Sequence, residues 1–253
     1  MPVPNVPEKL EHPSVTSPAT VTDYRGKRNL DAAPETVVLS YQRALADHVR
    51  TAHETTTLPH AGSSWNLHAL DETGGRVAVA EGFGIGAPMT ATVMERLVAQ
   101  GTRRFVIVGE SGSLQPDVRV GATVVADAAI RDEGTSYHYL PDDAEARATP
   151  AVRDRLTDAV ESDGRTAHVG PTWTTDALYR ETALEIEHYR DAGVLTVDME
   201  AAAVFAVAQA RDIEAGALFT VSDHLTPDGW EPHFADTDDQ LADLFDLVAA
   251  TFG

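Results

Sequence analysis

Two glycine-rich segments have spacings that are associated with ligand chemistry. The first, Gly82-Phe-Gly84-Ile-Gly86-Ala87, satisfies the G-x-G-x-x-A pattern after a short apolar strand, and Glu110 ends the next strand about 20 residues later, as a dinucleotide-binding turn requires. Pro88 follows the pattern at once, and the next strand runs into a second glycine-rich segment. A tight turn that only needs glycines explains the same residues, so dinucleotide binding is the weaker interpretation.

The second segment, Gly109-Glu-Ser111-Gly112-Ser113, nearly matches the G-x-S-x-G turn that exposes a nucleophilic serine. Ser113 stands where the last glycine is required, which disfavours a serine hydrolase. The sequence contains no cysteine, which excludes disulfides, thiolate catalysis and cysteine-based zinc or iron–sulfur sites. No metal ligand is assigned.

Two carboxylates beside later strands are stronger candidates. Glu200 stands at the start of an apolar helix, Ala-Ala-Ala-Val-Phe, where the helix dipole favours an ionised carboxylate. Asp223 directly follows the strand Leu218–Ser222. The ordinary structural explanations are a helix-capping Asp198 followed by a first-turn glutamate, and an aspartate in a turn. Because the helix is apolar enough to be buried, however, a glutamate at its beginning needs a partner.

The segments that must position these side chains alternate between strands and helices from Glu35 onward, which predicts an α/β domain. Strands are expected at residues 36–39, 76–80, 105–108, 123–130, 167–169, 194–197 and 215–221, and helices at 41–50, 89–100, 151–162, 181–192, 201–210 and 240–252. The stretch GESGSLQP is expected to be a loop. We predict a single domain, residues 34–253, with a twisted central mixed sheet flanked by helices. A polar, proline-bearing arm at residues 1–33 is expected to lie over the domain or on a neighbouring subunit.

The chain is strongly acidic: 40 Asp and Glu residues against 19 Lys and Arg residues give a net charge of −21, and only Lys9 and Lys27 are lysines. This charge argues against nucleic acid or a membrane as a partner. Carboxylates in every polar stretch, with so few lysines, favour a halophilic protein over an ordinary acidic one. No apolar run has the length of a signal-peptide core or a membrane span, so a cytoplasmic protein is expected.

The most specific signal is a series of six segments in a fixed order: GFGIGAP, GESGSLQPDVRVGATVV, IRDEGTSYHY, WTTDALYRET, VLTVDMEAAAVFAVA and TVSDHL. Each segment alone is weak. The ordered series, over roughly residues 76–225, resembles the nucleoside phosphorylase family that includes the hexameric purine enzymes and the uridine enzymes. The resemblance implies cleavage of the bond between a base and ribose, phosphate as co-substrate, no cofactor, and a homo-oligomer between a dimer and a hexamer.

The resemblance also assigns roles to the two carboxylates. During cleavage, ribose develops oxocarbenium character while the base leaves with extra electron density. The family glutamate matching Glu200 accepts hydrogen bonds from the ribose 2′- and 3′-hydroxyls, and the methionine matching Met199 packs under the sugar. In purine-cleaving relatives, the aspartate matching Asp223 gives a proton or a strong hydrogen bond to the departing purine nitrogen. Trp173 is expected to stack on the base, and a core tryptophan is about equally favoured.

Substrate contacts are further expected from five residues of the glycine-rich segments: Gly84, Gly86, Glu110, Ser111 and Gly112. The base class is less sharply defined. The Gln-x-Arg pair with which the uridine branch reads its base is missing after Tyr179, which favours a purine, whereas DEGTSYHY is closer to the uridine branch. Purine is slightly favoured over uracil.

The sequence departs from the family at the phosphate site. The family's Gly-Asp-Pro-x-Arg turn after the first strand is replaced by Leu39-Ser-Tyr-Gln-Arg43. Ile107 stands where a second arginine belongs and Glu110 where a serine or threonine belongs, and an arginine lent by the neighbouring subunit has no clear counterpart. A carboxylate at this place opposes phosphate unless it is neutralised. The candidates to rebuild the site from new directions are Arg43, Arg131 and Arg180.

We therefore predict cleavage of the N-glycosidic bond by phosphorolysis and keep two alternatives of different classes. One is a nucleosidase that uses water, because the phosphate-binding arginines are missing and Glu110 is suited to orient a water molecule. The other is a nucleoside-binding protein without turnover. A nicotinamide-dependent dehydrogenase is what the first glycine-rich segment would suggest if taken alone.

Overall fold

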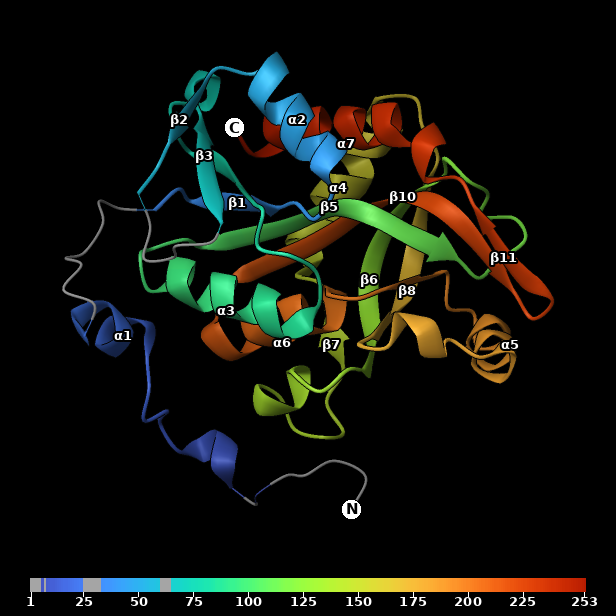
Figure 1. Ribbon diagram of the computed structural model, residues 1–253, viewed down its shortest axis with the longest axis horizontal. Coiled ribbons are helices and arrows are strands. Elements are labelled where there is room, and N and C mark those ends of the chain that lie inside the picture. The colour runs from blue at the N-terminus through green and yellow to red at the C-terminus, as the bar shows by residue number, and fades with distance from the viewer. Residues whose placement is uncertain (1–5, 7, 25–32, 60–64) are drawn as a thin grey trace.

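The protein is built around one large mixed sheet (Figure 1), and the computed structural model describes residue 6 and the ranges 8–24, 33–59 and 65–253. The strands are β1 Thr36–Leu39, β2 Thr55–Thr57, β3 Asn66–Leu70, β4 Val77–Glu81, β5 Arg104–Ser113, β6 Thr123–Asp132, β7 Ala146–Arg147, β8 Ala167–Thr175, β9 Thr196–Asp198, β10 Glu214–Thr226 and β11 Gly229–Pro232. The helices are α1 Pro18–Tyr24, α2 Arg43–Ala52, α3 Ala87–Val98, α4 Pro150–Ser162, α5 Ala183–Asp191, α6 Ala201–Arg211 and α7 Asp238–Phe252.

The sheet combines parallel and antiparallel pairs in the order β11-β10-β6-β8-β9-β5-β1-β4-β3-β2, with β7 paired to β6. Strands β1, β4 and β5 run parallel to one another, as do β5 with β10 and β6 with β8. Because β10 pairs with both β5 and β6, and β9 joins β8 to β5, these five strands close into a ring. The prediction of an α/β fold with a mixed sheet flanked by helices is confirmed.

Two layers of helices cover the two faces of the sheet (Figure 1), with α3 and α6 on one side and α2, α4 and α7 on the other. Successive strand residues point to opposite faces. In β1, Val37 and Leu39 therefore pack in the core layer of α3 and α6, whereas Val38 packs in the layer of α2, α4 and α7. Strands buried on both faces explain why these segments are continuously apolar.

The expectation of a loop at GESGSLQP is wrong for its first part, because β5 continues to Ser113. The glycine at position 112 serves close packing between strands. A side-chain carbon added there would lie 2.3 Å from Leu225 Cδ1 and 2.9 Å from Asp223 Oδ2. Gly112 thus lets β10 approach β5 closely enough to bring Asp223 beside it.

The sequence interpretation also missed several short elements: α1, β2, β3, β7 and β11. Strand β11 matters most for the site. It pairs antiparallel with the end of β10 through the turn Pro227-Asp-Gly229, with Asp223 opposite Pro232. Proline, aspartate and glycine in this order are turn residues, so the hairpin had a local signal.

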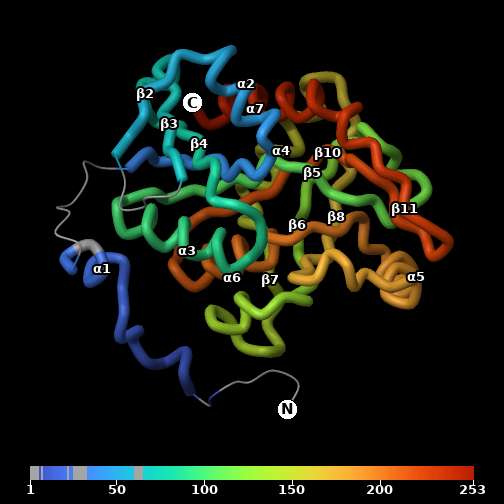
Figure 2. The backbone as a smooth tube through the Cα atoms, in the orientation of Figure 1, coloured from blue at the N-terminus to red at the C-terminus, as the bar shows by residue number. Residues whose placement is uncertain are grey.

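The N-terminal segment is described only in part, since residues 1–5, 7 and 25–32 lie outside the described ranges. Figure 2 shows α1 at the periphery of the molecule, away from the central sheet. Lys9 Nζ lies 3.2 Å from His138 Nδ1. The division into an arm and a domain stays a prediction. Within the described ranges, no helix has the length and apolar character that crossing a membrane would require.

Candidate active site

A cavity of about 750 Å³ opens where β5, β9 and β10 end. Its wall is completed by residues 41–42 before α2, by residues 178–186 leading into α5, and by the β10–β11 hairpin. It brings together four of the residues expected at the substrate from segments far apart in the sequence: Glu110, Ser111, Glu200 and Asp223. Met199 also lines it.

Glu200 is the residue directly before α6 and lines the cavity, and the Asp198 side chain binds the backbone at this helix start. Asp198 Oδ1 accepts hydrogen bonds from the backbone N–H groups of Glu200 at 3.0 Å and Ala201 at 3.2 Å. The Glu200 carboxylate reaches across to the first glycine-rich segment, where the N–H of Gly86 donates to Oε1 at 2.6 Å. Gly86 is the residue before α3 and has φ of 97°, which a glycine adopts readily. Glu200 therefore occupies the N-terminus of α3, where the helix dipole favours negative charge.

This placement also removes the basis for a dinucleotide site. In such a site the amides at the helix start face a pyrophosphate. Here a carboxylate takes the Gly86 amide, and its charge would repel a phosphate. The glycines at 82, 84 and 86 all have positive φ, so they fit the simpler explanation of a tight turn.

Both acids at the start of α6 are buried and have raised pKa values. Burial raises the pKa of Asp198 to about 6, against the opposing effect of its hydrogen bonds. Burial, and then the Asp198 charge, raise the pKa of Glu200 to about 8, although the Gly86 amide works in the other direction. A ligand that donates hydrogen bonds from hydroxyl groups would supply what the ionised Glu200 lacks.

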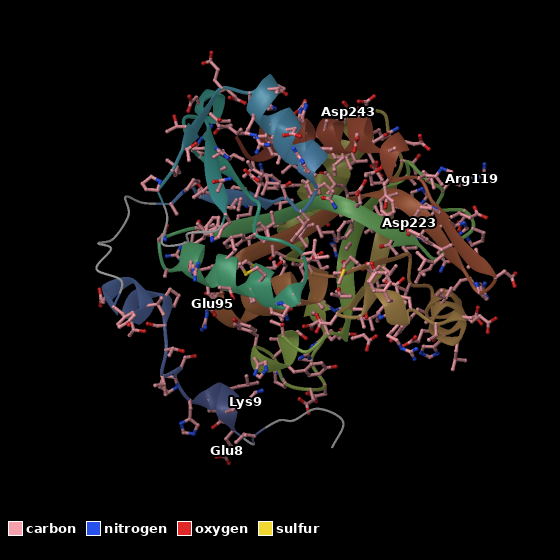
Figure 3. The ribbon with its side chains drawn as sticks, in the orientation of Figure 1. Glu8, Lys9, Glu95, Arg119, Asp223 and Asp243 are labelled. Atoms are coloured by element: carbon pink, nitrogen blue, oxygen red, sulfur yellow. The ribbon has the colours of Figure 1, made fainter. Side chains whose placement is uncertain are left out.

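Asp223, which is labelled in Figure 3, is held by two donors from its own hairpin. The Ser222 hydroxyl donates to Oδ1 at 2.7 Å, and the indole N–H of Trp230 donates to Oδ2 at 2.7 Å. Trp230 lies on β11, lines the cavity and is 58% exposed. The hairpin therefore orients the carboxylate and places an aromatic face next to it.

The second glycine-rich segment contributes one hydroxyl and one carboxylate. Ser111 Oγ is buried and, within the described part of the chain, makes no hydrogen bond. The Thr237 hydroxyl before α7 donates to Glu110 Oε1 at 2.8 Å. Burial, opposed by this hydrogen bond, raises the pKa of Glu110, and Asp238 and Asp223 add to the rise. An unpartnered buried hydroxyl in a cavity wall is available to a ligand.

Two residues of the segment in place of the family's phosphate turn line the cavity, and both are uncharged. Tyr41 and Gln42 line the wall, and the Tyr41 hydroxyl lies 3.2 Å from Thr90 Oγ1. Burial and the nearby Glu200 charge raise the pKa of Tyr41 well above its usual value. Ile107, at the position of a family arginine, is fully buried in the core between β5 and its neighbours.

The three arginines suggested as replacements do not line the cavity. Arg43 is exposed and pairs with Asp47 at 3.7 Å. Arg131 donates to the carbonyl oxygens of residues 140, 141 and 144 and to Ser136, so it organises a loop. Arg180 is exposed on a short turn. In the described residues, the cavity wall contains six carboxylate side chains and no lysine, arginine or histidine.

Four other expected substrate contacts also lie outside the cavity wall: Trp173, Gly84, Gly86 and Gly112. Trp173 is 1% exposed, stacks near Tyr189 and donates its indole N–H to Asp132. It fits the alternative of a core tryptophan, because it packs behind wall residues such as Val197. Gly84 and Gly86 shape the turn before α3, where the Gly86 N–H donates to Glu200, and Gly112 packs against β10.

Of the wall residues that the sequence analysis did not assign to the site, two matter for its chemistry. One is Trp230, described above. The other is Glu181, whose pKa is raised to about 7 by burial and by the charges of Asp223 and Glu185. It precedes Thr182, which caps α5 in a capping box with Glu185. That box marks where α5 begins, but nothing local indicates that the residue before it faces Asp223.

The arrangement can bind a small molecule with hydroxyl groups at one end and a flat ring at the other. Buried carboxylates accept from hydroxyls, and the hairpin offers an aromatic surface beside an oriented acid. In the described residues, no group of histidines and acids in the cavity wall has a metal-binding arrangement.

The sequence of the chain is similar to those of known proteins. The family model described as "Phosphorylase superfamily" matches residues 36–251. A guanosine phosphorylase of Halorubrum lacusprofundi is 39% identical over 163 residues, which are 62% of this chain and 65% of the relative. A uridine phosphorylase of Salmonella typhimurium is 30% identical over 170 residues, 62% of this chain and 66% of the relative. A DeoD-type purine nucleoside phosphorylase of Bacillus cereus is 31% identical over 154 residues, 60% and 65% of the two chains. Each alignment thus spans slightly less than two thirds of the relative's length.

Proposed function

The chain belongs to the phosphorylase superfamily, and from this premise we propose that it cleaves the N-glycosidic bond of a nucleoside with phosphate, giving a free base and ribose 1-phosphate. The relatives named for guanosine, uridine and purine nucleosides support a nucleoside as the substrate. Phosphate is the co-substrate, and the reaction needs no other cofactor.

The observation that carries the proposal is the meeting of Glu200 and Asp223 in one cavity, where Glu200 accepts from Gly86 before α3 and Asp223 accepts from Trp230 on β11. Glu200 accepts hydrogen bonds from the ribose hydroxyls, and Met199 packs under the sugar. As positive charge develops on ribose, a carboxylate close to it stabilises the transition state more than the ground state.

Asp223 assists the departing base. Its side chain is oriented by Ser222 and Trp230, and it gives a proton or a strong hydrogen bond to a ring nitrogen of the leaving base. Trp230 provides the face on which the base stacks. Glu181 lies on the same side and offers an acceptor to base N–H groups, which favours a purine such as guanine over uracil.

We call Met199, Glu200 and Asp223 the ribose–base end of the cavity. The wall around the attacking group is the acceptor end, formed by four residues: Tyr41, Gln42, Glu110 and Ser111. Phosphate enters at the acceptor end, with Ser111 Oγ as a donor. The described wall supplies no cation there, so the proposal requires a basic side chain from a neighbouring subunit.

A homo-oligomer is therefore part of the proposal. Apolar side chains stand exposed around the cavity mouth, among them Ile85 at 60% and Tyr179 at 94% exposure. Light scattering after size-exclusion chromatography in molar salt tests the assembly, and a monomer that turns over nucleosides with phosphate would contradict a borrowed cation.

The main experiment incubates the protein with guanosine, inosine, adenosine and uridine in molar salt, with and without phosphate, and follows the base and the sugar product. We expect base release to require phosphate and to yield ribose 1-phosphate, with purine nucleosides the better substrates. Binding of nucleosides without any turnover would identify a binding protein instead.

One observation favours a second function, hydrolysis. The six carboxylates in the wall and the lack of a basic side chain in its described part suit a water molecule better than a dianion. Glu110, with its raised pKa, would orient or deprotonate that water. In this case the product is free ribose, its rate does not depend on phosphate, and Glu110→Ala abolishes turnover.

A further inference from the structure

A second cluster of chemically capable side chains lies away from the cavity, between α2 and α7. His48 lies on α2, His53 directly follows it, and Asp246 lies on α7. The Nε2 atoms of both histidines lie 2.9 Å from the same Asp246 Oδ1. Among the described residues, the three ligand atoms lie within 4.8 Å of one another.

These separations suit a metal ion. In a tetrahedral zinc site with bonds of about 2.0–2.2 Å, neighbouring ligand atoms are about 3.3 Å apart. The observed nitrogen–oxygen separations require an opening of only a few tenths of an ångström to admit the ion. Two imidazoles and one carboxylate form a donor set that prefers zinc, cobalt or nickel to magnesium or calcium.

A fourth residue fixes the orientation of one ligand. Glu72 Oε1 lies 2.6 Å from His53 Nδ1, the ring nitrogen that faces away from Asp246. When Nδ1–H donates to this carboxylate, Nε2 presents its lone pair to a metal, as in the carboxylate–histidine–zinc arrangement. The ring of Phe245 contacts both imidazoles edge to face, at centroid distances of 5.4 and 6.4 Å, and so forms an apolar floor.

The cluster is accessible from solvent, and its two histidines are largely buried. The side chains of His48 and His53 are 25% and 15% exposed, and that of Asp246 is 48% exposed. An ion can therefore enter, and one coordination position stays open to water.

We propose that His48, His53 and Asp246 bind a divalent transition-metal ion, zinc by preference, with Glu72 orienting His53. The ion links α2 to α7. The chain just before α2 supplies Tyr41 and Gln42 to the cavity, and Thr237 just before α7 donates to Glu110. The metal thus braces the two helices beside the acceptor end, independently of which reaction takes place there.

The test uses the full chain without added histidines, stripped of metal by a chelator and kept in molar KCl so that the acidic surface is screened. Zinc is titrated by calorimetry, cobalt by its visible absorption, and the melting temperature is measured with and without zinc. We expect one site per chain, a cobalt spectrum of tetrahedral intensity, and a melting temperature that rises by several degrees with zinc.

Asp246→Asn removes a ligand with almost no change of shape and should abolish these effects, whereas Glu72→Gln should weaken zinc binding about tenfold. The matched controls are Asp243→Asn on the same helix, labelled in Figure 3, and His188→Asn on α5, which should both bind zinc like the unmodified chain. The melting temperature of each metal-free variant verifies folding.

Three results would overturn the proposal. The first is no binding heat and no cobalt spectrum in the unmodified chain. The second is equal binding by Asp246→Asn, which would indicate cations held only by the acidic surface. The third is a melting temperature that zinc leaves unchanged, in which case the cluster is a hydrogen-bonded network with a protonated His53 at its centre.

Discussion

The ribose–base end and the acceptor end of the cavity both contain carboxylates, but these carboxylates have different partners. At the ribose–base end, Glu200 receives the Gly86 amide and Asp223 receives the Trp230 indole. At the acceptor end, Glu110 is held by the Thr237 hydroxyl, and its neighbours Tyr41 and Gln42 are neutral. In the part of the chain that the structure describes, both carboxylates of the first end have an N–H donor, whereas no basic side chain lines the second end.

The carboxylates at the ribose–base end fit the roles that the family resemblance implies, whereas the carboxylate at the acceptor end does not. Glu200 is buried beside a helix N-terminus and still has a raised pKa, so its ionised form would gain from further hydrogen-bond donors. Ribose hydroxyls are such donors. Glu110, in contrast, lies where the proposal places phosphate, and an anion offers no hydrogen-bond donor that would favour a carboxylate there. The variants below therefore probe the two ends separately.

The largest effect is expected for Asp223→Asn. The amide keeps the shape and can still accept from Trp230, but it cannot give a proton to the departing base. We expect kcat/KM for purine nucleosides to fall about 100-fold, the usual scale for a lost general acid. Steady-state kinetics on guanosine and inosine measure it, with Asp243→Asn as the surface control. If uridine is the better substrate and the variant cleaves it normally, the purine assignment fails.

Glu200→Gln should cost at least about 2 kcal/mol in transition-state binding, because a charged acceptor for two hydroxyls becomes neutral. The pH profile adds a sharper test. With the pKa of Glu200 near 8, its ionised fraction falls about tenfold for each pH unit below that value. We expect kcat/KM of the unmodified chain to rise with pH up to about 8 and the variant to lose this limb.

The exposed Glu187→Gln on α5 provides the control and should retain both the rate and the pH limb. An unchanged kcat/KM in Glu200→Gln would remove this residue from the site. A limb that persists in the variant would assign the titration to another group, of which Glu181 is the first candidate.

The same substitution should stabilise the fold at alkaline pH. The pKa of Glu200 is 4.5 ordinarily and about 8 in the folded chain, so between these values the folded state holds the proton more tightly. Stability therefore falls as pH rises through this window, and glutamine escapes the loss. One unit of pKa shift corresponds to about 1.4 kcal/mol, so the variant should gain at least about 2 kcal/mol between pH 5 and 9. Denaturant unfolding of both proteins at each pH measures it, and a constant difference would contradict the buried, raised acid.

Much of this architecture could be predicted from local sequence. Strands buried on both faces are continuous apolar runs such as Thr36–Leu39, and their alternation with amphipathic helices identifies the α/β class. The extension of β5 to Ser113 could not be predicted in this way. Its glycines look like a loop locally, and only the approach of Leu225 and Asp223 on β10 explains Gly112.

In the candidate site, too, some residues could be predicted from local sequence and others only from the tertiary fold. Glu200 and Asp223 stand out because an acid at the mouth of a buried helix or strand is locally unusual. Their partners do not, since Gly86 and Glu200 are joined only by the tertiary fold and Trp230 depends on a hairpin. Trp173 and Trp230 are the same residue type, but Trp173 is buried in the core whereas Trp230 is exposed. Only the tertiary packing distinguishes the two.

A smaller effect is expected at the acceptor end. If phosphate enters there, Glu110→Gln removes a like charge near the anion, a change of about 1 kcal/mol for unit charges about 4 Å apart that are screened as in bulk water. KM for phosphate should fall about fivefold while KM for the nucleoside stays the same. Initial rates over a matrix of both substrates measure the two constants, with Glu187→Gln as the control. Loss of turnover in Glu110→Gln, with free ribose as the product of the unmodified chain, would favour hydrolysis.

The last prediction concerns salt and separates the surface from the cavity. Net charge of −21 makes the surface repel itself in dilute buffer, so the melting temperature should rise from dilute buffer to molar KCl as this repulsion is screened. Buried charges are screened much less, so the stability gained by Glu200→Gln at pH 9 should be nearly the same at both salt concentrations. Thermal unfolding of both proteins over a salt series measures the two quantities together. A melting temperature that ignores salt would refute salt adaptation and leave the proposed site intact. A gain that disappears in molar salt would instead show that Glu200 interacts with the solvent-exposed charges, and the contrast between the cavity and the surface would fail.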